Sequence, residues 1–312
     1  MTTVLKLPTG NAICYSGYRH GQSPGEKIYP SVAEIREDLH LLRKHWSLLR
    51  LYDCSTHAER VLQVIRADRL PMQVMLGAHL GAEMNNFGCP WGATWTEAQL
   101  EANMRENEAE IDRLIALAGR YADIVFSVAV GNEATVDWTD HFVPVPRMIE
   151  HVRRVRSAVA QPVTFCENYV PWQNKLADLV PEVDFISVHT YPVWEYRHIH
   201  EAIGYTKDNV ESVARLYPGK LLVITEAGWC TNSNGRGMHA EHAVQELQAV
   251  YYQDLMDWTR EQGLLCFVFE AFDEPWKGSP DPLEPEKHWG LFTVDRRPKL
   301  VMETLYPELL AP

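Results

Sequence analysis

The stretch IVFSVAVGNE occupies residues 124–133 and places an asparagine and a glutamate directly after an almost continuous apolar run. Such a run is typical of a strand that is covered on both faces, as in a parallel sheet. A carboxylate at the end of a buried strand is costly to bury without partners, so its position calls for an explanation. The same pattern of an apolar run with a polar ending recurs along the chain on both sides of this stretch.

Eight such runs alternate with longer amphipathic stretches. They predict strands over residues 12–18, 48–52, 72–79, 124–131, 163–168, 185–191, 221–229 and 264–272. Helical patterns cover residues 31–46, 96–120, 148–159 and 240–262, and the first two open with capping boxes. This alternation predicts an α/β fold, namely one (β/α)8 TIM barrel domain over residues 1–312. A doubly wound sheet is the alternative, but no Gly-x-Gly-x-x-Gly follows the first strand to support a dinucleotide site.

The composition excludes several classes of protein. The chain is 46% hydrophobic and contains 10 Trp, 13 Tyr and 9 Phe, too many aromatic residues for a disordered polypeptide. No run of about 18 apolar residues occurs, so we expect no membrane span. The net charge of −13 disfavours nucleic acid and anionic membranes as partners. A small-molecule or neutral polymer substrate remains.

The cysteines and the N-terminus bear on the compartment. The six cysteines form no C-x-x-C pair, so a zinc site of that type is not supported and a reducing compartment fits. The first residues, MTTVLKLPTG, do not resemble a signal peptide. We therefore expect a cytoplasmic protein, or a periplasmic or secreted one if a leader segment has been removed.

Two glutamates are the candidate catalytic residues. The active site of a barrel lies at the C-terminal ends of its strands, where Glu133 follows the fourth strand and Glu226 lies in the seventh. These strands face one another across an eight-stranded barrel, so the two carboxylates can converge. Such a pair suits glycoside cleavage, with a protonated Glu133 as acid/base and an ionised Glu226 as nucleophile. Their separation would decide between retention and inversion. Both could instead be structural carboxylates held by salt bridges.

Six motifs carry a resemblance to a known family. They are CYSGYR at 14–19, LLRLYD at 48–53, VGNE at 130–133, ITEAGW at 224–229, FDEPWK at 272–277 and HWGLF at 288–292. With them the chain resembles glycoside hydrolase family 17, the β-1,3-glucanases and glucanosyltransferases, in its bacterial form. The resemblance implies a retaining enzyme that acts on β-1,3-glucan or laminari-oligosaccharides by double displacement, without a cofactor or metal. The chain departs from the plant enzymes at Pro275-Trp276, where they have Asn-Gln.

The resemblance also implies roles for residues around the two glutamates. Asn132 would hydrogen-bond the 2-hydroxyl of the sugar at the cleavage site, Tyr191 would touch the nucleophile, and Tyr15 would line the same subsite. Glu274 and Lys277 would bind sugar hydroxyls or tune the two glutamates. Other substrate-binding candidates follow from the same motifs.

Arg50 and Trp289 are such candidates. Arg50 could hold Glu226 ionised by charge pairing, or it could simply pair with Asp53. Trp289 lies in the HWGLF motif and would offer its ring face as a platform for a sugar. The sequence leaves the choice for Arg50 open.

Three histidines could have either a structural or a functional role. His189 lies two residues before Tyr191, and orienting its neighbours is the favoured role over proton transfer. His239 and His242 fall three residues apart near the start of a helix. They could form a metal pair, but no third ligand is apparent from the sequence, which favours a solvated helix face.

We therefore expect a glycoside hydrolase whose partner is a β-glucan or a gluco-oligosaccharide, with a monomer favoured. A β-1,3-glucanosyltransferase is the alternative, because it shares the first half-reaction and differs only in the attacking group. More remote alternatives are a barrel glycosidase of other β-glycoside specificity and a non-catalytic sugar-binding barrel.

Overall fold

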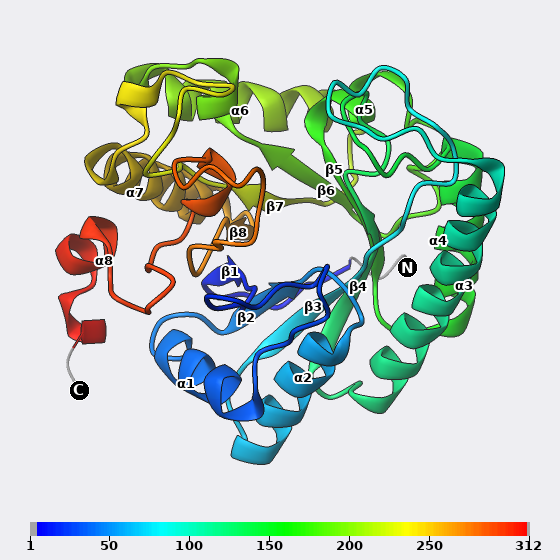
Figure 1. Ribbon diagram of the computed structural model, residues 1–312, viewed down its shortest axis with the longest axis horizontal. Helices are drawn as coiled ribbons and strands as arrows, with labels where there is room; N and C mark the ends of the chain where they lie inside the picture. The colour runs from blue at the N-terminus through cyan, green and yellow to red at the C-terminus, as the bar shows by residue number, and fades with distance from the viewer. Residues whose placement is uncertain (1–4, 311–312) are drawn as a thin grey trace.

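The computed structural model describes residues 5–310 and contains a closed barrel of eight parallel strands (Figure 1). Residues 1–4 and 311–312 of the expected domain lie outside this part. The strands are β1 (Ala12–Cys14), β2 (Leu48–Leu51), β3 (Gln73–Ala78), β4 (Val125–Asn132), β5 (Val163–Asn168), β6 (Ile186–Thr190), β7 (Leu222–Ala227) and β8 (Cys266–Val268). Each strand pairs with its neighbours in the chain, and β1 also pairs with β8. The predicted (β/α)8 barrel is confirmed.

Helices surround the strands in Figure 1. They are α1 (Val32–Leu42), α2 (Thr56–Asp68), α3 (Glu97–Arg120), α4 (Val145–Ala158), α5 (Tyr169–Asn174), α6 (Ile199–Leu216), α7 (Gln245–Gln262) and α8 (Leu300–Leu305), with 3-10 turns η1 (Pro192–Glu195), η2 (Ala240–His242), η3 (Pro285–Lys287) and η4 (Pro307–Leu310). Both predicted capping boxes form, at Ser31 and Thr96. No helix within residues 5–310 has the length and apolar character needed to cross a membrane.

Strands β1 and β8 are shorter than their apolar runs predict. Beyond Val268 the backbone no longer follows one neighbouring strand. Phe269 donates to the carbonyl of Ala227, and Ala271 donates to that of Cys14. The main chain at this end of the barrel therefore bonds to several segments in turn, which interrupts the regular ladder although the apolar side chains continue.

A buried ion cluster fastens the end of the chain to the first helix. Asp38 of α1 is fully buried and accepts two hydrogen bonds from Arg296, each 2.7 Å long. Arg19 donates to the same carboxylate at 3.0 Å. Arg296 also donates to the carbonyl oxygen of Gly17. The cluster thus joins the β1–α1 loop, α1 and the segment that follows β8.

We predict that Asp38→Ala lowers the free energy of unfolding by about 3–5 kcal/mol, because it leaves a buried guanidinium without its counter-charge. Urea unfolding followed by circular dichroism measures the change. Glu37→Ala is the matched control, since Glu37 pairs with Arg19 from a side chain that is 62% exposed and such pairs contribute about 0–1 kcal/mol. Equal losses in the two variants would contradict the prediction.

Candidate active site

Glu133 and Glu226 reach the same point from two strands. Glu226 lies inside β7, whereas Glu133 directly follows β4 and has a left-handed backbone with φ of 44°. Its N–H donates to the carbonyl of Cys166 on β5 at 2.9 Å. A non-glycine residue with positive φ is uncommon, and such residues gather at functional sites. The end of β4 is therefore bent where it carries Glu133.

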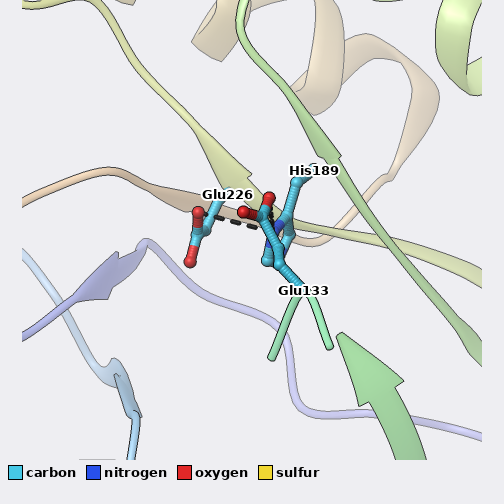
Figure 2. A group of neighbouring side chains, drawn as sticks. All are labelled: Glu133, His189 and Glu226. Carbon is cyan, nitrogen blue, oxygen red and sulfur yellow. Dashed lines mark hydrogen bonds and ion pairs between the residues drawn. The ribbon is translucent and has the colours of Figure 1, made fainter. Parts of the chain in front are cut away.

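His189 of β6 contacts both carboxylates, as the dashed lines in Figure 2 mark. Its Nδ1 is 2.9 Å from Oε1 of Glu133 and 3.4 Å from Oε2 of Glu226. One oxygen from each glutamate and one nitrogen of His189 all lie within 4.8 Å of one another. The carboxyl oxygens of Glu133 and Glu226 thus approach one another to within 4.8 Å.

Three donors besides His189 surround the Glu226 carboxylate. Arg50 donates to Oε1 at 2.5 Å, Tyr52 donates to the same oxygen at 3.0 Å, and Tyr191 donates to Oε2 at 2.5 Å. Burial opposes ionisation of Glu226. The positive charges of His189 and Arg50, together with the hydrogen bond from Tyr191, outweigh it and lower the pKa of Glu226 to about 2. Glu226 is therefore ionised at neutral pH.

His189 is charged for the reciprocal reason. Complete burial lowers the pKa of its imidazole, but the Glu226 carboxylate opposes this most strongly, with further contributions from Cys166 and Glu133. The result raises the pKa of His189 to about 10. The imidazolium can therefore donate a hydrogen bond from Nδ1 to the carboxylates on both sides.

Arg50 resolves the choice that the sequence leaves open. Its buried guanidinium pairs with Glu226, whereas Asp53 accepts hydrogen bonds from Ser55. Arg50 also donates to the side-chain oxygen of Asn132. Because that oxygen is occupied, the amide NH₂ of Asn132 is the end available to a ligand. Arg50 therefore links the nucleophile candidate to the residue that precedes Glu133.

Glu274 and Lys277 form a second charged cluster beyond β8. Lys277 Nζ lies 3.1 Å from Glu270 and also pairs with Glu274, which is fully buried. The Trp276 indole donates to Glu274 at 3.0 Å. Although burial opposes it, the carboxylates of Glu270 and Glu274 raise the pKa of Lys277. The lysine is therefore a fixed positive charge, and its side chain is 18% exposed.

Two predicted site residues are turned away from the glutamates. The Tyr15 hydroxyl donates to Asp38 at 3.0 Å, and the ring is buried against His57 and Phe272. Its hydroxyl is thus committed to the cluster beneath α1 and does not line the cleavage subsite as expected.

Trp289 is the second correction. Its side chain is fully buried, with the rings of Tyr191, Trp194 and Phe269 packed around it at centroid distances of 5.0, 5.8 and 5.7 Å. A sugar platform needs an exposed ring face, and these neighbours cover it. Trp289 instead supports Tyr191, which contacts Glu226.

Tyr52 and Glu270 are the contacts that sequence reasoning missed. Tyr52 lies two residues after Arg50, and this spacing puts both side chains on one face of an extended chain. Glu270 follows the apolar run of the eighth strand and could have been found by the same rule that identified Glu133. Glu270 is buried and Tyr52 is half-buried, and each lies beside a charged partner.

The central group also has the residue types of a metal site. Within residues 5–310, Glu133, His189 and Glu226 are the single group of three whose ligand atoms lie close enough to hold an ion. The His189 nitrogen that faces both glutamates is Nδ1, and it is already engaged with their carboxylates. We therefore interpret the group as an acid–base centre.

Comparisons with known proteins identify the family of the chain. A family model described as the BtgE/BtgC glycoside hydrolase domain matches residues 12–290. A glucan 1,3-beta-glucosidase of Arthroderma benhamiae is 23% identical over 281 residues, which cover 86% of this chain and 83% of that protein. The match covers a smaller share of the length of two other curated relatives, 53% of the first and 40% of the second.

Solved structures have the same fold. An endo-laminarinase from Formosa Hel1_33_131 is 29% identical with a TM-score of 0.82, and the match covers 96% of this chain and 87% of that one. A glycoside hydrolase family 17 beta-1,3-glucanosyltransferase from Rhizomucor miehei is 20% identical with a TM-score of 0.73, covering 94% and 96%. The second likeness shows the fold alone.

We predict that His189 stays protonated between pH 5 and 9. The folded pKa of about 10 exceeds the unfolded value of about 6.5. Its contribution to stability is thus complete below about pH 6.5 and is lost as the pH rises through about 10. Nitrogen-15 NMR of the histidine rings, assigned with a His189→Gln spectrum, measures the titration.

In Glu226→Gln the midpoint should move to a lower pH, because the principal negative neighbour of His189 is gone. His20→Gln is the control for an exposed histidine and should leave the His189 signal unchanged. A wild-type His189 signal that titrates near pH 6.5 would contradict the assignment.

Proposed function

The chain belongs to the BtgE/BtgC glycoside hydrolase family, and we propose that it cleaves β-1,3-linked glucans by double displacement with retention of anomeric configuration. The expectation that the chain is a glycosidase is confirmed by that membership. The substrate proposal is supported by the names of its relatives, a glucan 1,3-beta-glucosidase and an endo-laminarinase. We also propose that the chain is a member of glycoside hydrolase family 17.

The separation of the two carboxylates is the observation that carries the mechanism. Retaining glycosidases hold their carboxyl groups about 5–5.5 Å apart, whereas inverting ones need about 6.5–9.5 Å to admit a water molecule. The oxygens of Glu133 and Glu226 come within 4.8 Å. This spacing is close to that of retaining enzymes and below the range of inverting ones, which favours direct attack by one carboxylate.

In the first half-reaction Glu226 is the nucleophile. Its ionised carboxylate attacks the anomeric carbon, the glycosidic bond breaks, and Glu133 transfers its proton to the departing oxygen. The environments suit this division, because the Glu226 side chain is 6% exposed and held by fixed donors, whereas that of Glu133 is 27% exposed. The product of this step is a glycosyl ester of Glu226.

In the second half-reaction the ester is broken. Glu133, now ionised, removes a proton from water, and the resulting hydroxide attacks the anomeric carbon while Glu226 leaves as a carboxylate. Arg50, Tyr52 and Tyr191 then stabilise the released charge in the positions that they already occupy. The second inversion at carbon restores the original configuration.

Asn132 and Lys277 are proposed to bind the sugar. The free NH₂ of Asn132 would donate to the 2-hydroxyl, and Lys277 would donate to another hydroxyl from the β8 side of the barrel. Both are anchored through their other contacts, Asn132 by Arg50 and Lys277 by Glu270 and Glu274. Anchored donors lose little entropy when the substrate binds.

Glucanosyl transfer is the second candidate function. It requires no residue beyond those used in hydrolysis, and a beta-1,3-glucanosyltransferase from Rhizomucor miehei has the same fold. Transfer uses the same ester of Glu226, but a sugar hydroxyl replaces water as the group that Glu133 deprotonates. The products alone distinguish the two outcomes.

A time course with laminari-oligosaccharides of defined length tests the reaction. We expect shorter products whose first-formed reducing ends are β-anomers by proton NMR. Products longer than the substrate would identify glucanosyl transfer. First-formed α-anomers would contradict retention, and the absence of any reaction would contradict the proposed substrate.

Variants at the two glutamates test their separate roles. Glu226→Gln should lower kcat by roughly 10⁴-fold or more, because no carboxylate attacks. Glu133→Gln should lower kcat by roughly 10²–10⁴-fold, and less for an aryl glycoside whose leaving group needs no proton. Glu37→Gln, on the outside of α1, is the control and should retain full activity. Near-normal turnover of Glu226→Gln would overturn the mechanism.

Azide separates the two roles further. With Glu226→Ala and a glycosyl fluoride of α configuration, the fluoride occupies the face that the carboxylate has vacated, and an acceptor sugar displaces it from the opposite face to form a β-glycoside. With Glu133→Ala and an aryl β-glycoside, azide attacks the ester of Glu226 and forms a β-glycosyl azide. A β-glycosyl azide from the Glu226 variant and an aryl β-glycoside would reverse the assignment.

A further inference from the structure

Histidines from two loops meet on the surface beside the barrel mouth. His198 lies in the β6–α6 loop as the N-cap of α6, while in the β7–α7 loop His239 is the N-cap of the η2 turn and His242 is its last residue. His198 and His239 are exposed, and His242 is half-buried. The sequence identifies His239 and His242 as a pair without a third ligand. The fold brings His198 to that pair from about 40 residues earlier in the chain.

The three rings lie close together, although their nitrogens are not within reach of one ion in the present side-chain conformations. The ring centroids are 4.6 Å apart for His198 and His242, 5.1 Å for His239 and His242, and 6.0 Å for His198 and His239. Two imidazoles bound to one tetrahedral zinc, at Zn–N distances of about 2.0–2.1 Å, have centroids about 5 Å apart. The observed spacings lie on both sides of that value.

We propose that His198, His239 and His242 bind one divalent transition-metal ion of the zinc type, which bridges the two loops. In this structure the rings pack on one another, so coordination requires rotation of the side chains until their nitrogens face a common point. Exposed side chains make such rotations within nanoseconds. Neutral imidazole is the form of histidine that binds zinc.

The backbone of the site is held independently of any ion. The carbonyl of His242 accepts a hydrogen bond from the Trp229 indole at 2.8 Å, and its N–H donates to the carbonyl of His239 at 3.0 Å. The N–H of His198 donates to the Glu201 carboxylate at 3.1 Å. Glu241 adds negative charge 3.9 Å from Nδ1 of His239. The backbone at these positions is thus held in place, and only the side chains must rotate to bind an ion.

An ion at this point would join segments that lead directly from the site. The β6–α6 loop follows Tyr191, and the β7–α7 loop follows Glu226. The loops already pack together through Trp194, whose ring lies 5.1 Å from the Arg236 guanidinium. A metal bridge would add a second link farther along both loops. Binding should therefore raise the thermal stability of the folded chain.

Zinc titration of chelator-treated and dialysed protein at pH 7.5 tests the proposal. Isothermal calorimetry should show one ion bound per chain, and differential scanning calorimetry should show a Tm several degrees higher with zinc. His242→Ala and His198→Gln should each weaken binding at least tenfold and remove the increase in Tm. His20→Ala is the matched control, an exposed histidine elsewhere on the surface, and should bind as the wild type does.

Glu226→Gln separates this site from the central acid–base group. It should bind zinc as tightly as the wild type, because Glu226 lies outside the histidine cluster. Loss of binding in Glu226→Gln, with His242→Ala unaffected, would place the ion between the catalytic glutamates and overturn the proposal. Unchanged affinity in both His198→Gln and His242→Ala, or no saturable binding by the wild type, would also overturn it.

Discussion

A buried negative charge inside the barrel is the constraint on which the site depends. An ionised carboxylate removed from water costs several kcal/mol unless charges and hydrogen bonds replace its hydration. Glu226 receives these from Arg50 on β2, His189 on β6, and the hydroxyls of Tyr52 and Tyr191. The partners come from opposite sides of the barrel. Closure of the sheet and ionisation of Glu226 are therefore coupled.

The same constraint gives the two glutamates different environments. Glu226 is enclosed by fixed donors, whereas Glu133 follows a bent strand end and reaches solvent. Carboxylates that share a site but differ in environment can perform opposite tasks, one as an ionised nucleophile and one as a proton donor. His189 contacts both and links their charge states. The two glutamates differ in environment because β4 ends just before Glu133, whereas Glu226 lies inside β7.

Buried ion pairs also join segments of the chain outside the site. Asp38 of α1 pairs with Arg296, and Lys299, which pairs with Asp273 at 2.6 Å, also donates to Thr231 at 2.7 Å, so the segment after β8 is tied to the body of the barrel at two points. This segment carries Trp289, which packs beneath Tyr191. Through Tyr191 the C-terminal part of the chain supports the Glu226 carboxylate. The distant ion pairs thus help to hold the site in place.

Local patterns in the sequence determined the barrel, the order of its strands and the two glutamates. Apolar periodicity, capping boxes and strand-end carboxylates depend on residues close together in the chain, so the sequence alone could reveal them. Helices α2, α5, α6 and α8 were not singled out by these patterns, although the alternation required helices between the strands. Strands β1 and β8 were predicted too long, because apolar character persists where the backbone has left its ladder.

Contacts between distant segments were decided only by the tertiary structure. Arg50 had two plausible partners, and the closed barrel placed it against Glu226. Tyr15 and Trp289 lie in site-like motifs, yet packing by later segments turned one toward Asp38 and covered the other. His198 joined His239 and His242 because two loops meet at the rim. A linear pattern records which groups follow a strand, but the direction of a side chain and its partners depend on how the whole chain packs.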